Sequence, residues 1–478
     1  MRQPLCVLLL LGLLSGCQYW AWPHATVWPW ASGTPEPEGF LDARFDVDGK
    51  LLLQNRGLGV LTGTALTPVL QKDGRLVVAG YTDQGFRLAR FMPDGSLDSQ
   101  FGMDGTQPVH AVSVEQQGIR QLLQQADGKL VLIGAREQQD GSPGTDFYVA
   151  RFTADGQPDD SFGDGGSVMT HLGLSAAAHV AIELEGGDLL VGGEACVEAE
   201  PPTPAGQHVC VNSEFALARY QPNGQLAESF GWKGIFMLPI TRLPEAIKAI
   251  VPLRNGELLL VGSSGTDLAW ACIGKDGKLD TRFADGAGKQ VLLDSVSGEL
   301  PLFIQEQADG DLLLAGTRVE PGGQQQFLVQ RFQRNGKPDG GFANGGSLLL
   351  DLGIGSVLSG MTPLSDEREW VMGEVCVRQL FVSLNRARSC VESDIALLRL
   401  TNNGTLDPLW GQDGVWMASV SSARDMPLGA FAADNGDTLL VARSCRDASC
   451  ARWDFSMLRL VLHLQSTTVP ETPAITEP

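Results

Sequence analysis

The stretch TDFYVARFTADGQPDDSFGDGG, residues 145–166, decides the fold, because near copies of it recur at a period of about sixty residues. The copies are FRLARFMPDGSLDSQFGMDG (86–105), FALARYQPNGQLAESFGWKG (215–234) and FLVQRFQRNGKPDGGFANGG (327–346), with looser ones at 268–286 and 395–414. Repetition at this period predicts a repeat architecture, in which each unit packs against its neighbours along the chain.

Each unit also contains an apolar run that follows an Asp-Gly or Asn-Gly pair. The runs include RLVVAG after Gly74, KLVLIG after Gly128, ELLLVG after Gly256 and DLLLAG after Gly310. Such pairs tolerate positive φ and close tight hairpins, so each one marks a turn between two strands. The apolar run is nearly continuous, which suits a strand buried on both faces. With the strands on either side of the second turn, each unit holds four antiparallel strands, which is typical of a propeller blade.

Two counts of the units both give seven. The Leu-Asp-x-x-Phe type segments begin at 41, 97, 158, 226, 279, 338 and 406, and the apolar runs begin at 75, 129, 188, 257, 311, 369 and 437. The chain starts with an orphan LDARF at 41–45 and ends without this segment. An N-terminal piece that supplies what the last repeat lacks closes a ring of blades. We therefore predict an all-β, seven-bladed propeller over residues 39–465, closed by residues 40–53 against 450–464.

The repeat resembles a known family. The sequences DGKLVLIG, DFYVARFTADG and DDSFGDGG, in this order and at this period, are similar to the delta-60 repeats of bacterial surface and exported proteins, a β-propeller family without a settled activity. The resemblance covers about residues 39–462 and implies the propeller fold. It implies no catalytic residue, because the family offers no catalytic motif to match.

The first residues resemble the export signal of a lipoprotein. Arg2 precedes an apolar run that is too short to span a membrane and that ends in small residues, which predicts a cleaved signal peptide over residues 1–16. The following LSGC, residues 14–17, resembles the lipobox of bacterial lipoproteins, which implies that Cys17 is lipidated and that the membrane is a partner through this lipid. A secretory signal with a chance cysteine is the alternative. Gln18 implies the outer membrane of the bacterial cell envelope.

Two further segments flank the predicted propeller. Residues 17–38 hold four tryptophans among Pro, Gly and Ser, which predicts either a tether lying on the lipid headgroups or a plain flexible linker. Residues 466–478 are rich in Pro, Thr and Glu, which predicts a disordered tail. The whole chain has 35 basic and 56 acidic residues, and its net charge of −21 argues against nucleic acid as a partner.

One arginine recurs at the same place in six units, in most of them eight residues before the aspartate of the next segment. The expected pairs are Arg90 with Asp98, Arg151 with Asp159, Arg331 with Asp339, Arg399 with Asp407 and, through ring closure, Arg459 with Asp42. A partly buried arginine needs an acidic partner, so structural pairing is favoured over ligand binding. Two units break the pattern, with Cys272 in the arginine position and Ala227 in the aspartate position.

Six cysteines flank equivalent variable loops in three units. The predicted disulfides are Cys196–Cys210, Cys376–Cys390 and Cys445–Cys450, because an exported chain favours disulfides over metal or redox sites. We expect the loops to lie between the third and fourth strands of their blades, on one face of the disc. Insertions on one face often mark a binding face, although neutral decoration is the alternative. Cys272 is left over and is predicted to be buried in a strand.

Sequence motifs give little support to an enzyme. The chain has no Gly-x-Ser-x-Gly, His-Glu-x-x-His, P-loop or dinucleotide motif, and its histidines are scattered. Asp46–Gly49 and Gly163–Gly166 resemble pieces of calcium loops, but turn chemistry explains them, and an EF-hand loop from Asp46 would need an acid at the place of Gly57. We expect no catalytic residue, no cofactor and no metal site.

Two functions therefore remain open. The first is a protein-interaction or scaffold module with a protein or surface-ligand partner, acting through the disulfide-linked loops. The second is a lyase or hydrolase with an active site at the central channel, which a propeller can build from residues far apart in sequence. Convergent acids, histidines or arginines in the channel would favour the enzyme. An apolar patch over residues 196–210 and 376–390 would favour the binding module.

Overall fold

The computed structural model describes residues 41, 50–52, 61–65 and 68–460, with gaps at 83–84, 110–117, 139–141, 202–208, 293–294, 298–301, 365–366, 382–387, 433–437, 447–449 and 451. The predicted signal peptide, tether and tail lie outside these ranges. Within them, the only helix is the three-residue 3-10 turn Ala284–Gly286. No helix in the described ranges has the length and apolar content that a membrane crossing needs.

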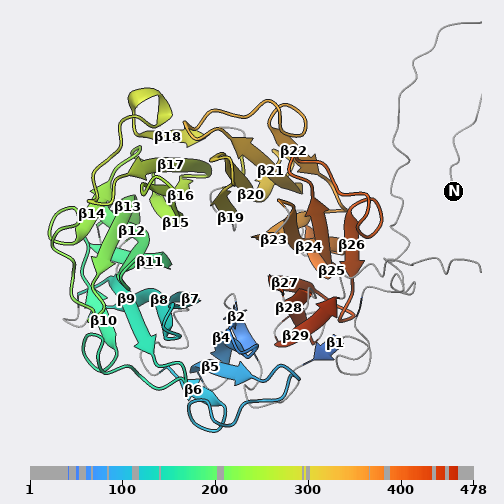
Figure 1. The fold of residues 1–478 in the computed structure, drawn as a ribbon, viewed down its shortest axis with the longest axis horizontal. Helices are drawn as coiled ribbons and strands as arrows, with labels where there is room; N and C mark the ends of the chain where they lie inside the picture. Colours follow the sequence, from blue (N-terminus) through green and yellow to red (C-terminus); the bar gives the residue numbers. More distant parts are fainter. Residues whose placement is uncertain are drawn as a thin grey trace, which may run out of the picture.

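Seven antiparallel four-stranded blades form a ring around a central axis, as predicted (Figure 1). Blade 1 holds β3 (Val69–Leu70), β4 (Leu76–Thr82), β5 (Gly85–Phe91) and β6 (Thr106–Pro108); blade 2 holds β7 (Ile119–Gln124), β8 (Leu130–Glu137), β9 (Thr145–Phe152) and β10 (Ser167–Thr170). Blade 3 holds β11 (Ser175–Glu183), β12 (Leu189–Ala199), β13 (Cys210–Tyr220) and β14 (Ile235–Leu238); blade 4 holds β15 (Glu245–Pro252), β16 (Leu258–Ser264), β17 (Asp267–Ile273) and β18 (Lys289–Leu292).

The remaining blades follow the same order, with the first strand innermost in each (Figure 1). Blade 5 holds β19 (Leu302–Glu306), β20 (Leu312–Val319), β21 (Gln325–Phe332) and β22 (Ser347–Leu350); blade 6 holds β23 (Ser356–Pro363), β24 (Glu369–Phe381), β25 (Arg388–Leu400) and β26 (Val415–Ala418). Blade 7 holds β27 (Asp425–Ala432), β28 (Thr438–Cys445), β29 (Trp453–Leu460) and the N-terminal strand β1 (Lys50–Leu52). The strand β2 (Leu61–Ala65) lies beside β4.

The N-terminal segment closes the ring by completing blade 7. β1 pairs antiparallel with β29, with Lys50 opposite Leu458. Leu41 also forms a bridge with Leu460, in the way that Leu97 does with Phe91 in blade 1. Leu41 therefore takes the place in blade 7 that Leu97 has in blade 1, β1 adds a strand beside β29, and the predicted closure is confirmed for the residues that the structure describes.

The core lies between neighbouring blades. All seven residues of β4 are buried, and so are all seven of β16, because each second strand is covered by a sheet on both sides. Between blades 1 and 2, for example, Val77 and Leu88 pack in one cluster with Leu130 and Tyr148. The continuous apolar runs in the sequence are the consequence of this stacking.

A β-bulge interrupts the pairing of the first and second strands at the same place in five blades. The bulge explains the glycine that ends the apolar run in several repeats. A Cβ on Gly193 would lie 1.9 Å from the carbonyl oxygen of Ala177 across the bulge. Because a bulge re-aims the side chain of its extra residue, these inner-strand positions are where the repeat can present side chains differently from one blade to the next.

Candidate functional site

The disc has two unlike faces. Turns such as Asp127-Gly128 and Asp155-Gly156, which join the first strand to the second and the third to the fourth, lie on one face, here called the turn face. The loops that join the second strand to the third lie on the opposite face, here called the stapled-loop face, because successive strands are antiparallel.

The three predicted disulfides are present on the stapled-loop face. Cys196–Cys210 joins β12 to β13, Cys376–Cys390 joins β24 to β25, and Cys445–Cys450 spans the connection from β28 to β29. The prediction that these loops follow the third strand was wrong. The turn before each apolar run already closes a hairpin with the inner strand, so the apolar run is the second strand. Since all three loops join equivalent strands, they still share one face.

Two of these hairpins extend beyond the rest and expose apolar side chains. The strands of the blade 6 hairpin have 13 residues each and those of the blade 3 hairpin have 11, whereas β8 and β9 have eight. Val209 is 51% exposed in the first stapled loop and Leu380 is 49% exposed in the second. Beside them, the N–H groups of Leu174 and Ile354 donate to the carbonyl oxygens of Cys196 and Cys376, and both side chains are also exposed.

On the turn face, the structure brings together the four arginine–aspartate pairs whose residues are all described. The distances from arginine Nε to aspartate Oδ2 are 2.8 Å for Arg90–Asp98, 2.7 Å for Arg151–Asp159, 2.6 Å for Arg331–Asp339 and 2.8 Å for Arg399–Asp407. Asp42, the expected partner of Arg459, lies outside the described residues. In blade 3, where Ala227 replaces the aspartate, Arg219 pairs at 2.8 Å with Asp188, which directly precedes the second strand.

The repeated arginine also links its blade to the next one. Arg90 Nη1 donates to the carbonyl oxygen of Ala154 at 2.8 Å, and Arg331 Nη1 donates to that of Asn402 at 3.1 Å. In blades 1, 2, 5 and 6 the guanidinium lies over the aromatic ring of its own segment, as Arg151 does over Phe162 at 4.5 Å. The arginine therefore fills the junction between adjacent blades with a buried, paired cation.

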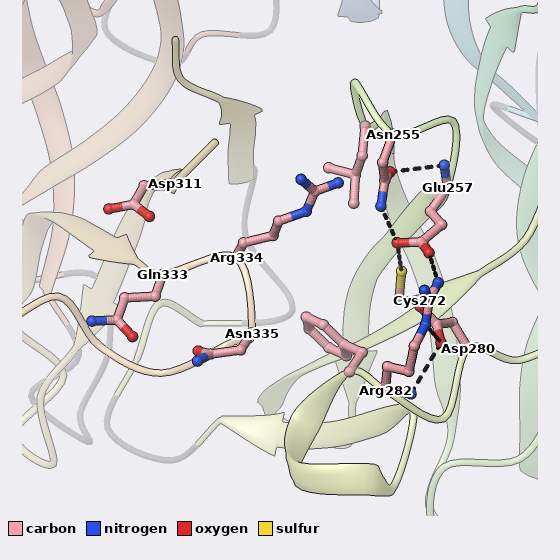
Figure 2. Close-up of a pocket in the computed structure, with 11 residues that line it drawn as sticks. Asn255, Glu257, Cys272, Asp280, Arg282, Asp311, Gln333, Arg334 and Asn335 are labelled. Carbon is pink, nitrogen blue, oxygen red and sulfur yellow. Dashed lines mark hydrogen bonds and ion pairs between the residues drawn. The ribbon is translucent and has the colours of Figure 1, made fainter. Parts of the chain in front are cut away.

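Blade 4 lacks this arginine, and a pocket of about 730 Å³ lies at the junction with blade 5 (Figure 2). Cys272 of β17 takes the arginine position and is 1% exposed. Its Sγ lies 3.8 Å from Oε2 of Glu257, which directly precedes the second strand. Figure 2 shows Glu257, Cys272, Asp280 and Arg282 on one wall, with residues 311 and 333–335 of blade 5 across from them.

Arg282 supplies a different cation to the acids of this pocket. Its Nε donates to Asp280 Oδ1 at 2.8 Å, and its Nη2 contacts both Asp280 and Glu257 (Figure 2). The hydrogen bond from Arg282 lowers the pKa of Asp280 to about 2, although burial acts in the opposite direction. Burial, with the negative charges of Glu257 and Asp280, raises the pKa of the Cys272 thiol to about 12, so the free thiol is protonated at neutral pH and is a poor nucleophile.

A second cluster lies where the inner strands of blades 2, 3 and 4 line the axis (Figure 1). Arg120, His179 and Lys248 are the extra residues of three equivalent bulges, and His179 Nε2 lies 3.6 Å from Oε1 of Glu194. Burial lowers the pKa of His179, although Glu194 acts in the opposite direction. Burial also lowers the pKa of Lys248, and Arg120 acts in the same direction.

Sequence reasoning missed both clusters. The histidines looked scattered because His179 meets Arg120 and Lys248 only through the ring geometry. A signal was nevertheless present: all three basic residues stand at one position of the repeat, 14 residues before the glycine that ends the run. Arg120 precedes Gly134, His179 precedes Gly193 and Lys248 precedes Gly262, each across the bulge.

Comparison with known proteins supports the fold. A family model described as a domain of unknown function, DUF5122 beta-propeller, matches residues 71–101, 125–162 and 307–342, which belong to blades 1, 2 and 5. No curated protein has a significant match to the chain.

Solved structures that resemble the chain do so at low sequence identity. They include a glucose dehydrogenase (14% identity, TM-score 0.37, 86% of this chain and 98% of that one) and the polysaccharide lyase Uly1 (10% identity, TM-score 0.42, 86% and 91%). The extracellular domains 1–2 of Drosophila Semaphorin 1b also match (10% identity, TM-score 0.28, 84% and 73%). Similarities at this level do not indicate an activity for this chain. The ring of blades and the family match together make this chain a β-propeller protein.

Proposed function

We propose that the chain is a lipid-anchored propeller of the bacterial cell envelope, attached to the outer membrane through Cys17, and that it serves as a protein-interaction or scaffold module. The binding surface is the stapled-loop face. The observation that carries this proposal is the pair of extended, disulfide-linked hairpins of blades 3 and 6, each with exposed apolar side chains at its base or along its strands.

Exposed apolar side chains on a stapled hairpin are suited to binding. Burial of apolar surface against a partner provides the free energy of association, whereas ordering of loops on binding reduces it. The disulfides Cys196–Cys210 and Cys376–Cys390 restrict these loops before any partner binds, which lowers the entropic cost. Charged side chains on the same hairpin can add specificity for a partner. Arg378 pairs with Glu392 across the blade 6 hairpin at 2.7 Å, and both side chains remain accessible to a partner.

The binding test compares exposed apolar residues of the two faces. Leu380→Ser on the stapled-loop face is compared with Leu409→Ser, a matched control that is 72% exposed in the segment after the second turn of blade 6. After crosslinking in intact cells, we expect the recovery of a specific partner to fall by about tenfold for Leu380→Ser and to be unchanged for Leu409→Ser. Equal recovery with both variants would contradict the assignment of this face.

The anchoring test uses Cys17→Ser. Loss of the lipidated residue is expected to move the protein from the membrane fraction to the soluble fraction and to abolish incorporation of a labelled fatty acid. If the variant stayed in the membrane fraction, the lipid anchor would be excluded as the means of attachment.

A second candidate function is an envelope lyase or hydrolase. It is favoured by the convergence of Arg120, His179, Lys248 and Glu194 near the channel axis, which combines cations with a neutral imidazole and a carboxylate. Anionic small molecules and oligosaccharides, screened for turnover with the protein and with His179→Gln, would test it. Turnover that His179→Gln removes would support the enzyme, and turnover unaffected by the substitution would exclude this cluster.

A further inference from the structure

We propose that Cys272, Glu257 and Asp280 form a binding site for a divalent metal ion of the zinc class in the pocket between blades 4 and 5. The sequence predicts no metal site, because six cysteines are expected in disulfides, the histidines are scattered and Cys272 stands alone. The fold removes that isolation by placing two carboxylates beside the thiol.

The first argument is a comparison between blades. At the place of Cys272, six other blades carry an arginine, and in blades 1, 2, 5 and 6 its guanidinium contacts the aspartate of the following segment. Asp280 is the aspartate of that segment in blade 4. The fold therefore provides a position for a buried cation at each of these junctions. In blade 4 the residue at this position is Cys272, whose short side chain does not reach the neighbouring blade but whose thiol can bind a metal ion.

The second argument is the geometry of the donor atoms. One thiol sulfur and one carboxylate oxygen from each acid lie within 4.8 Å of one another. The distance from Cys272 Sγ to Glu257 Oε2 is 3.8 Å. Tetrahedral zinc with its usual bond lengths to sulfur and oxygen separates two such ligands by about 3.6 Å. The thiol and Glu257 are thus close to this spacing, and donors at the widest separation of 4.8 Å would need to approach by about 1 Å to share one ion.

The third argument is access. Arg282 contacts both carboxylates from the solvent side and is 79% exposed, so it can leave them without opening the core (Figure 2). The junction is also looser here. The N–H of Ala284 donates to the carbonyl oxygen of Asn335 at 3.4 Å, whereas the equivalent bond from Gly163 to Asn223 measures 3.0 Å. An incoming cation would replace Arg282 as the partner of the two acids.

The donor set selects the ion. A thiolate with two carboxylates favours zinc and chemically similar divalent ions over magnesium and calcium, which prefer oxygen ligands. Binding breaks the S–H bond of Cys272, forms a metal–sulfur bond and releases one proton to solvent. Three protein ligands leave one tetrahedral position open toward the pocket, where Asn335 and Asp311 line the opposite wall.

The test uses cobalt(II) as a spectroscopic probe and the full-length chain with its three disulfides formed. We expect a thiolate-to-cobalt charge-transfer band that zinc removes by competition. Cys272→Ser should abolish the band and weaken zinc binding by about a hundredfold, and Asp280→Asn should weaken it by about tenfold or more. Arg282→Gln should tighten binding, because it removes the competing cation.

Two further measurements keep the test decisive. Cys272→Arg restores the repeat residue and should abolish binding while the melting temperature stays the same or rises, so that loss of binding is separated from loss of fold. Circular dichroism of Cys272→Ser serves the same purpose. The proposal is overturned if the protein gives no charge-transfer band, if the band persists in Cys272→Ser, or if Cys272→Ser and the parent chain bind zinc equally.

Discussion

The two faces of the disc are built from the same repeat, but one face is nearly uniform and the other is variable. On the turn face, one arrangement recurs from blade to blade: a short turn, a buried arginine and an aspartate that lie against the next blade. On the stapled-loop face, the loops differ in length, in charge and in the presence of a disulfide. The contacts that recur in several blades stabilise the ring, and we expect the functional residues among the features that differ between blades.

By the same reasoning, the exception on the turn face is informative. Blade 4 departs from the repeat at Cys272, and the pocket of about 730 Å³ lies at this place. A changed residue on the stapled-loop face would be less informative, because the loops of that face already differ from blade to blade. The turn face therefore offers an internal reference against which a single changed residue can be interpreted.

The largest expected effect comes from removal of a repeated arginine. Arg151→Ala would leave Asp159 buried without its main partner, and loss of one member of a buried pair costs about 3–5 kcal/mol. Lys278→Ala, the control, removes a cation that is 84% exposed from an aspartate, Asp276, that is itself 51% exposed, and should cost much less stability. Urea unfolding of both variants measures the difference. Equal costs would mean that the arginines do not hold the blades together.

On the stapled-loop face, the effect of a disulfide should depend on the size of its loop. Conversion of Cys376 and Cys390 to Ser opens a loop with a sequence separation of 14 and should destabilise by about 3 kcal/mol on the entropy model. The same change at Cys445 and Cys450, with a separation of 5, should cost about 2 kcal/mol. Thermal unfolding without reductant checks the order, which would be refuted if the shorter loop mattered more.

A smaller effect is expected from a buried acid near the turn face. Burial raises the pKa of Glu369 to about 7, although hydrogen bonds from Gln305 and Gln307 lower it. The carboxyl is thus protonated in the folded protein at pH values where the unfolded chain has lost the proton. Its contribution to stability is complete below a pH of about 4.5 and is lost as the pH rises through 7.

Glu369→Gln should remove this pH dependence. At pH 8 the variant is expected to be more stable than the parent chain by about 2 kcal/mol, and at pH 4 the two should unfold at nearly the same denaturant concentration. Denaturant titrations at the two pH values provide the comparison. A variant that is less stable at pH 8 would show that the carboxylate is better paired than its burial suggests.

The smallest effect on stability should come from the exposed residues of the stapled-loop face. Leu380→Ser is expected to change the free energy of unfolding by no more than about 0.5 kcal/mol, because the side chain is 49% exposed. Its effect on partner recovery should nevertheless exceed that of Arg151→Ala and of Glu369→Gln. A large loss of stability would instead show that Leu380 stabilises its own hairpin.

Sequence alone predicts the architecture because its signals are local and repeated. Asp-Gly and Asn-Gly pairs, continuous apolar runs and the Leu-Asp-x-x-Phe segment each act within a few residues, and several copies agree. The Arg151–Asp159 contact was also within reach, since eight residues of one repeat separate the two. The blade count and the ring closure follow from the same periodicity.

The candidate sites were harder to predict because they depend on register and on bulges. Cys272 meets Glu257 through the pairing of β16 with β17, which no single residue reveals. Arg219 pairs with Asp188, in the turn before β12, in the blade where Ala227 replaces the repeat aspartate. Arg120, His179 and Lys248 are brought near one another only by the arrangement of three separate sheets around the axis.

The closure of the ring has a mechanical consequence. In the described part of the chain, β1 contributes three residues to blade 7, and it comes from the end of the chain that is proposed to carry the anchor. Any pull between the membrane and a bound partner would then reach blade 7 first, at the bridge of Leu41 with Leu460 and next at the pairing of β1 with β29. Such a strand can be peeled from its neighbour one hydrogen bond at a time, so blade 7 is the place where load would open the ring and expose an unpaired strand edge.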